Sequence, residues 1–123
     1  MSVRVVSIVL QFIIGAGLLN VWLVRPRSAT PYRGGSARSL REEFTEYGLP
    51  PFMFYLVGTL KVVAGIILLA GFWLPLPVAS ATIIVALLML GALAMHTKVK
   101  DSRQKSVPAA IVLGLCLALL AVR

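Results

Sequence analysis

Four long apolar runs dominate this chain of 123 residues and restrict what it can fold into. The runs cover residues 5–24, 52–73, 78–96 and 107–122. A helix of about 20 residues spans roughly 30 Å, which is the thickness of the hydrocarbon core of a bilayer. A small water-soluble domain needs a charged surface, whereas charged residues make up only 13% of this chain. The sequence therefore predicts one all-α domain, a membrane-embedded four-helix bundle whose apolar surface faces the lipid bilayer.

The longest polar segment, residues 25–51, lies between the first and second apolar runs. In its second half, Ser39 followed by Glu42 is typical of the capping box that begins a helix. Apolar residues recur there at helical spacing, at Leu40, Phe44 and Tyr47. We expect a short amphipathic helix over residues 40–47, either lying at the membrane interface or packed on the end of the bundle.

The last apolar run is the shortest of the four and contains Pro108 near its start. Proline is tolerated in the first turn of a helix because the N–H that it lacks would have no partner there. We therefore expect Pro108 in the first turn of a helix over residues 107–122.

The positive charge of the chain is concentrated at one end of the expected bundle. The formal net charge is +8, and eleven of the twelve Lys and Arg residues lie outside the apolar runs. Nine of them fall in the polar segments 25–51 and 97–106, against Arg4 and Arg123 at the other end. Because cytoplasmic loops carry an excess of Lys and Arg, we expect both polar segments in the cytoplasm and both termini on the opposite side. Basic residues placed in this way contact lipid headgroups, so we expect no nucleic-acid partner.

Lys61 is the only charged residue inside an apolar run. It lies nine residues into that run, about 13 Å from the polar end at 1.5 Å per residue. A charge at the bilayer centre costs ~3 kcal/mol, so this side chain should face the bundle interior or water. There it either binds an anionic or carbonyl-bearing ligand or a partner's carboxylate, or is a structural lysine satisfied by carbonyls, water or a lipid phosphate.

Three uncharged polar residues are further candidates for binding a ligand or partner: Gln11, Asn20 and His96. Gln11 and Asn20 are nine residues apart, which is about 180° around a helix, so both cannot face Lys61. His96 ends the third run, where it either interacts with the helix C-terminus or lines a ligand site. It has no Cys, Asp or Glu nearby in its own helix, and we expect no metal site.

Small residues recur along the expected helices, among them Gly15, Gly58, Gly65 and Gly91. Small side chains allow two membrane helices to approach closely. We expect these four glycines to serve helix packing, within the chain or in a homo-oligomer.

No catalytic motif is recognisable in the sequence. It has no phosphate-binding glycine loop, no HExxH, no nucleophile with a base and no paired histidines to hold haem. The single cysteine, Cys116, cannot form a disulfide within the chain. We expect no enzymatic activity and no cofactor, unless a quinone or lipid is bound.

Two glycine-containing segments resemble those of a known family. Residues 58–69 read GTLKVVAGIILL and are soon followed by a short turn with two prolines, while residues 91–96 read GALAMH and are followed by Lys98, Val99 and Asp101. With the amphipathic segment before the second run, the chain resembles the DoxX-like family of small four-helix membrane proteins. It is also similar to the related chaperone of nicotinic acetylcholine receptors.

The resemblance implies two kinds of function. The family takes its name from a membrane subunit of a thiosulfate:quinone oxidoreductase, and other relatives are linked to the assembly of membrane proteins. We expect a non-enzymatic protein that binds another membrane protein and assists its assembly. The alternative is a quinone- or lipid-binding subunit of a membrane redox complex, with Lys61 near the headgroup and His96 at the mouth. The receptor chaperone looks acidic where this chain has Lys61, so the resemblance does not imply a shared surface there.

Overall fold

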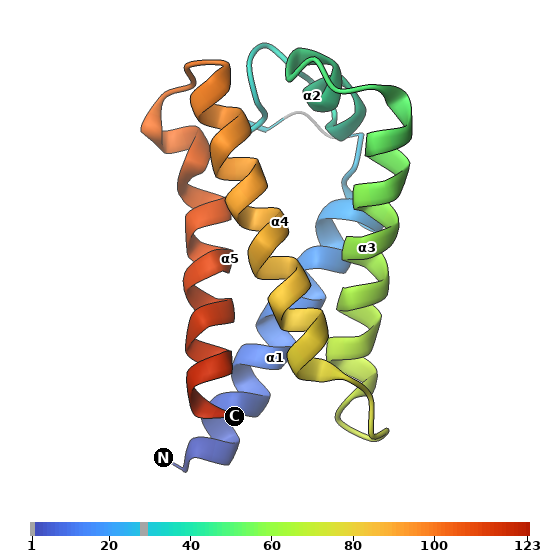
Figure 1. Ribbon diagram of the computed structural model, residues 1–123, viewed down its shortest axis with the longest axis vertical. Helices are drawn as coiled ribbons and strands as arrows, with labels where there is room; N and C mark the ends of the chain where they lie inside the picture. Colours follow the sequence, from blue (N-terminus) through green and yellow to red (C-terminus); the bar gives the residue numbers. More distant parts are fainter. Residues whose placement is uncertain (1, 28–29) are drawn as a thin grey trace.

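The computed structural model describes residues 2–27 and 30–123, and residues 28 and 29 of the expected first loop lie outside the described part (Figure 1). The described residues form five α-helices and one π-helical turn: α1 (Val3–Leu19), η1 (Asn20–Val24), α2 (Leu40–Glu46), α3 (Pro51–Ala70), α4 (Val78–Lys98) and α5 (Arg103–Val122). Four spans are long and apolar enough to cross a membrane: α1 continued by η1, then α3, α4 and α5. The expected all-α membrane bundle is confirmed.

The four long helices form a ring in which each contacts two others. α1 packs against α3 and α5, and α4 packs against the same two helices. Both termini lie at one end of this bundle, whereas α2 and the connection between α4 and α5 lie at the other (Figure 1). We refer to the end with α2 as the polar end.

The close approach of α1 and α3 depends on two glycines. A Cβ atom on Gly15 would lie 3.1 Å from the carbonyl oxygen of Gly65, and one on Gly65 would lie 3.2 Å from the carbonyl oxygen of Gly15. Gly58 is equally tight, because its Cβ would meet the ring of Trp22 at 2.7 Å. Gly91 differs from these three: it is exposed and a Cβ there would meet nothing within 4 Å, so a packing role for Gly91 within the described chain is wrong.

The helix α2 forms where the capping box predicts it. The hydroxyl of Ser39 accepts a hydrogen bond from the amide of Glu42 at 3.1 Å, which begins the helix. Its apolar residues Leu40 and Phe44 are buried, and the ring of Phe44 packs edge-on against that of Trp22. The apolar face of α2 therefore closes the polar end of the bundle.

The last helix begins earlier than the apolar run. α5 begins at Arg103, so Pro108 is its sixth residue and the expectation that it lies in the first turn is wrong. The first turn of α5 is stabilised by Lys105, whose Nζ donates to the carbonyl of Gly35 at 2.5 Å and lies 3.6 Å from Oδ1 of Asp101. Polar contacts outside the apolar run therefore extend the helix toward its N-terminus.

Candidate functional site

The turn that ends α4 brings an acid onto the single histidine. The amide of Asp101 donates to the carbonyl of His96 at 2.9 Å, and that of Lys100 donates to the carbonyl of Thr97 at 3.1 Å. These two bonds are those of a Schellman motif, with Lys100 in the left-handed position at φ 58°. The chain therefore doubles back, and Nδ1 of His96 lies 2.7 Å from Oδ2 of Asp101. Because an ionised carboxylate only accepts hydrogen bonds, Nδ1–H is the donor and Nε2 faces away from Asp101.

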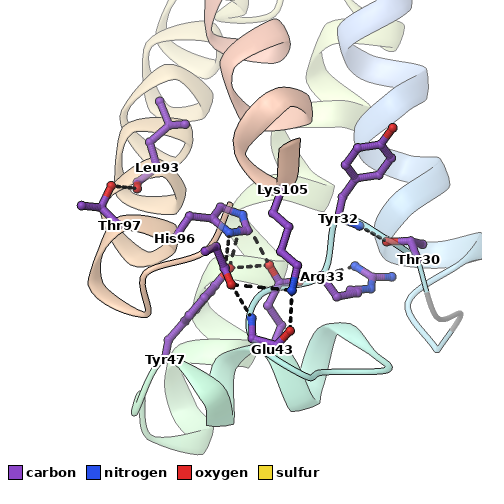
Figure 2. Close-up of polar contacts among 11 residues, drawn as sticks. Thr30, Tyr32, Arg33, Glu43, Tyr47, Leu93, His96, Thr97 and Lys105 are labelled. Atoms are coloured by element: carbon purple, nitrogen blue, oxygen red, sulfur yellow. Dashed lines mark hydrogen bonds and ion pairs between the residues drawn. The ribbon is translucent and has the colours of Figure 1, made fainter. Parts of the chain in front are cut away.

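On the Nε2 side, α2 contributes a second acid and a phenol. Nε2 of His96 lies 3.5 Å from the hydroxyl of Tyr47 and 4.0 Å from Oε1 of Glu43. The Tyr47 hydroxyl donates to the same carboxylate oxygen at 2.5 Å. Figure 2 shows the side chains of Tyr47, Glu43 and Lys105 gathered around the His96 ring. The other oxygen of Glu43 lies 3.6 Å from the guanidinium of Arg33, which is also buried.

The protonation of this cluster follows from its contacts. Burial would raise the pKa of Asp101, but hydrogen bonds from His96 and from the amide of Gly35, with Lys105 nearby, outweigh burial and hold that pKa below its ordinary value of 3.8. Burial, together with the hydrogen bond to Glu43 and its negative charge, raises the pKa of Tyr47 above its ordinary range. Near neutral pH, Asp101 is therefore ionised and Tyr47 keeps its proton.

A cavity of about 590 Å³ lies inside the bundle next to this cluster. Its polar lining includes Arg33, Glu43, Lys61, His96 and Lys105. Its apolar lining comes from the transmembrane helices and includes Leu18, Val21, Met89, Ala109 and Val112. The volume falls within the range of pockets that hold small molecules in proteins. The cavity thus has charged groups at one end and hydrocarbon side chains along its wall.

Lys61 reaches this cavity from the middle of α3. Its Nζ lies 5.5 Å from the centre of the Trp22 ring, which also lines the cavity. Within the described part of the chain, Nζ has neither an ion-pair partner nor a hydrogen bond. Arg33 and Lys105, in contrast, are each paired with an acid. Lys61 is therefore a half-buried cation of the cavity lining that no acid of the described chain contacts, although Glu43 of the same lining acts on its charge from a greater distance.

The four candidate residues separate into two groups. Lys61 and His96 line the same cavity although they are on different helices. Gln11 is buried toward the other end of the bundle, where its Nε2 donates to the carbonyl of Leu68 at 2.6 Å. Asn20 is exposed at the start of η1. Neither Gln11 nor Asn20 is among the residues that line the cavity.

Several residues of the site are not predicted by the sequence. Glu43, Arg33 and Tyr47 belong to a polar segment and a short helix, and nothing in their spacing relates them to His96. Asp101 did carry a signal, because an acid five residues after a histidine can return to it when a Schellman turn ends the helix between them. Among the described residues, no group of His, Cys, Asp and Glu side chains could hold a metal ion.

Comparison with known proteins identifies a family. The model of a family described as the DoxX-like family matches residues 7–120, which include the site and all of the described transmembrane helices except the first residues of α1 and the last of α5. No curated protein and no solved structure matches the chain.

Proposed function

This chain belongs to the DoxX-like family, and we propose that it binds a membrane-soluble molecule with an acidic or carbonyl head, a quinone or a lipid, in the cavity beneath α2. The charge of Lys61, which no acid contacts in the described part of the chain, is the observation that supports this function. A cation in the middle of a membrane span is costly when no acid contacts it, and an anionic or carbonyl oxygen placed in the cavity would stabilise it.

The lining of the cavity matches an amphipathic molecule. The charged side chains of the lining extend from the polar end to Lys61 in the middle of α3, so a ligand head placed among them would meet Lys61. A ligand tail would lie against apolar side chains such as Leu18 and Val112. In this proposal the protein positions the ligand and carries no reaction of its own; any redox chemistry would belong to a partner subunit.

Native mass spectrometry of the protein, extracted gently from its own membrane, tests the proposal. We expect the wild type to carry a molecule of quinone or lipid mass. Lys61→Met keeps an unbranched side chain and removes the charge, so occupancy should fall by about tenfold or more, as expected for the loss of one charge-assisted hydrogen bond. Lys100→Met is the matched control, because Lys100 is exposed and lies outside the cavity lining. Equal occupancy in the Lys61→Met protein would contradict the proposal.

Assistance to another membrane protein is the second candidate function. The observation in its favour is Gly91, which is exposed in the middle of α4 and leaves space for a helix of another chain to approach. The similarity to the chaperone of nicotinic receptors belongs to this candidate. The same spectra distinguish the two functions, because an assembly factor would carry a second protein chain and no small molecule. A second copy of this chain would instead indicate a homo-oligomer.

We also propose that the polar end faces the cytoplasm. Nine Lys and Arg residues lie in the segments at this end, against Arg4 and Arg123 at the end with the termini. Such an excess is typical of cytoplasmic loops.

A further inference from the structure

A second hollow lies on the lipid-facing side of α3, near the polar end. This groove has a volume of about 710 Å³ and lies between α3, η1 and the residues that lead into α2. Its floor on α3 includes Tyr55, Thr59 and Val63, all of which are exposed. Trp22 lines both the groove and the cavity and stands between them. The groove is therefore separate from the site that holds Lys61 and His96.

Two arginines supply the charge of the groove, and its lining residues include no acid. Arg27 and Arg41 both lie at its polar end. The Arg41 side chain is held in place, because its Nη1 donates to the hydroxyl of Tyr55 at 2.6 Å and its guanidinium lies 5.5 Å from the centre of that ring. The hydrogen bond to Tyr55 uses one N–H group of Arg41. A guanidinium has five N–H groups, and their geometry suits phosphate oxygens.

The length of the groove matches one leaflet of a bilayer. Its lining on α3 extends from Phe54 to Val63, which is about 13 Å of helix at 1.5 Å per residue. Half of a hydrocarbon core is roughly 15 Å thick. A lipid whose phosphate lies at Arg27 and Arg41 could therefore place an acyl chain along α3 as far as the bilayer centre.

We infer that this groove is a binding site for an anionic phospholipid of the surrounding leaflet. The two arginines bind the phosphate, Ser39 lies beside them in the lining, and one acyl chain packs along Thr59 and Val63. The site is independent of the proposed cavity function. It prefers a headgroup with net negative charge, because a zwitterionic headgroup brings its own cation against the two arginines.

The test uses the full chain purified with equal amounts of palmitoyl-oleoyl phosphatidylglycerol and phosphatidylcholine, and native mass spectrometry to count the lipids that remain bound. We expect the wild type to retain phosphatidylglycerol preferentially. Arg27→Gln with Arg41→Gln should reduce that preference about tenfold. Arg38→Gln with Arg103→Gln is the matched control: it removes the same charge from the same end, at exposed residues outside the groove.

A second variant tests the acyl-chain part of the site without changing charge. Val63→Trp places a large side chain in the lipid-facing groove, where it leaves the core unchanged, and should reduce phosphatidylglycerol retention as well. The loss caused by Arg27→Gln with Arg41→Gln should be the same in a Lys61→Met background, so a lipid lost from the cavity is distinguished from one lost from the groove. An unchanged preference in the Arg27/Arg41 variant would overturn the inference. An equal loss in the Arg38/Arg103 control would also overturn it, because retention would then depend on overall charge.

Discussion

His96 and Lys61 lie in the same cavity for different reasons. His96 is oriented by its hydrogen bond to Asp101, and the turn that ends α4 places Asp101 beside the ring. Lys61 takes its position from helix α3. Its Nζ lies over the ring of Trp22 and is not in contact with an acid of the described chain. The histidine is therefore held by the fold, whereas Lys61 is the residue that the proposed ligand would contact.

The ionised carboxylate of Asp101 should make stability depend on pH. Its pKa is lowered in the folded state, so its contribution is complete above the ordinary value of 3.8 and is lost as the pH falls through the lower folded value. We expect Asp101→Asn to reduce the free energy of unfolding by about 1–3 kcal/mol at pH 7, because the hydrogen bond from His96 loses its charged acceptor. Unfolding in detergent at pH 7 and at about pH 3 measures this. A difference between the two proteins that persists undiminished at the lower pH would contradict the role given to Asp101.

Residues differ in how far the sequence predicts their surroundings. Lys61 stands out because it is a single charge in an apolar run, and its inward position follows from the cost of charge in lipid. The surroundings of His96 depend on Glu43, which is 53 residues away in the sequence and comes from another helix. No local pattern reports such a contact, because it exists only after α2 has folded over the end of the bundle.

At the scale of elements, hydrophobicity predicts where the transmembrane helices are. Polar contacts determine the residues at which the helices begin and end. The start of α2 at its capping residue is confirmed, and the start of α5 is four residues earlier than the apolar run indicates. η1 is a π-helical turn that continues α1 and carries the buried Trp22 between the cavity and the groove. The apolar pattern of residues 20–24 does not distinguish a π-helix from an α-helix, so that turn was not predicted.

The end of α4 offers a test of how this element is terminated. Lys100 has a left-handed backbone at φ 58°, a conformation that is unfavourable for a residue with a Cβ atom and common for glycine at this position. Lys100→Gly should therefore raise the free energy of unfolding by about 0.5–1 kcal/mol, after the greater flexibility of glycine in the unfolded chain is allowed for. Lys100→Ala, which removes the charge and keeps the Cβ atom, should give no such gain. Equal effects of the two substitutions would show that the lysine charge, and not its backbone, determines the result.

At the scale of the whole molecule, the bundle is asymmetric from end to end. An even number of spans returns both termini to one end, and α2 lies at the other (Figure 1). The charged cluster and residues that line both hollows also belong to this polar end. The distribution of charge along the sequence already indicated that the two ends differ. The polar segment also lines the cavity together with the transmembrane helices. The sequence does not predict this, because the lining residues are far apart in the chain.

The orientation of this asymmetric bundle in the membrane can be tested by cysteine labelling. Cys116 is buried, and Cys116→Ala gives a protein without cysteine. A single cysteine is then added at one of two exposed positions: Ser36 at the polar end, or Leu74 in the turn at the opposite end. If the nine cations of the polar end hold it in the cytoplasm, a membrane-impermeant maleimide applied to intact cells should label Leu74→Cys and leave Ser36→Cys unlabelled. Permeabilised cells should label both, which controls for reactivity. Labelling of Ser36→Cys in intact cells would show the reverse orientation, with α2 and the charged cluster on the opposite side of the membrane.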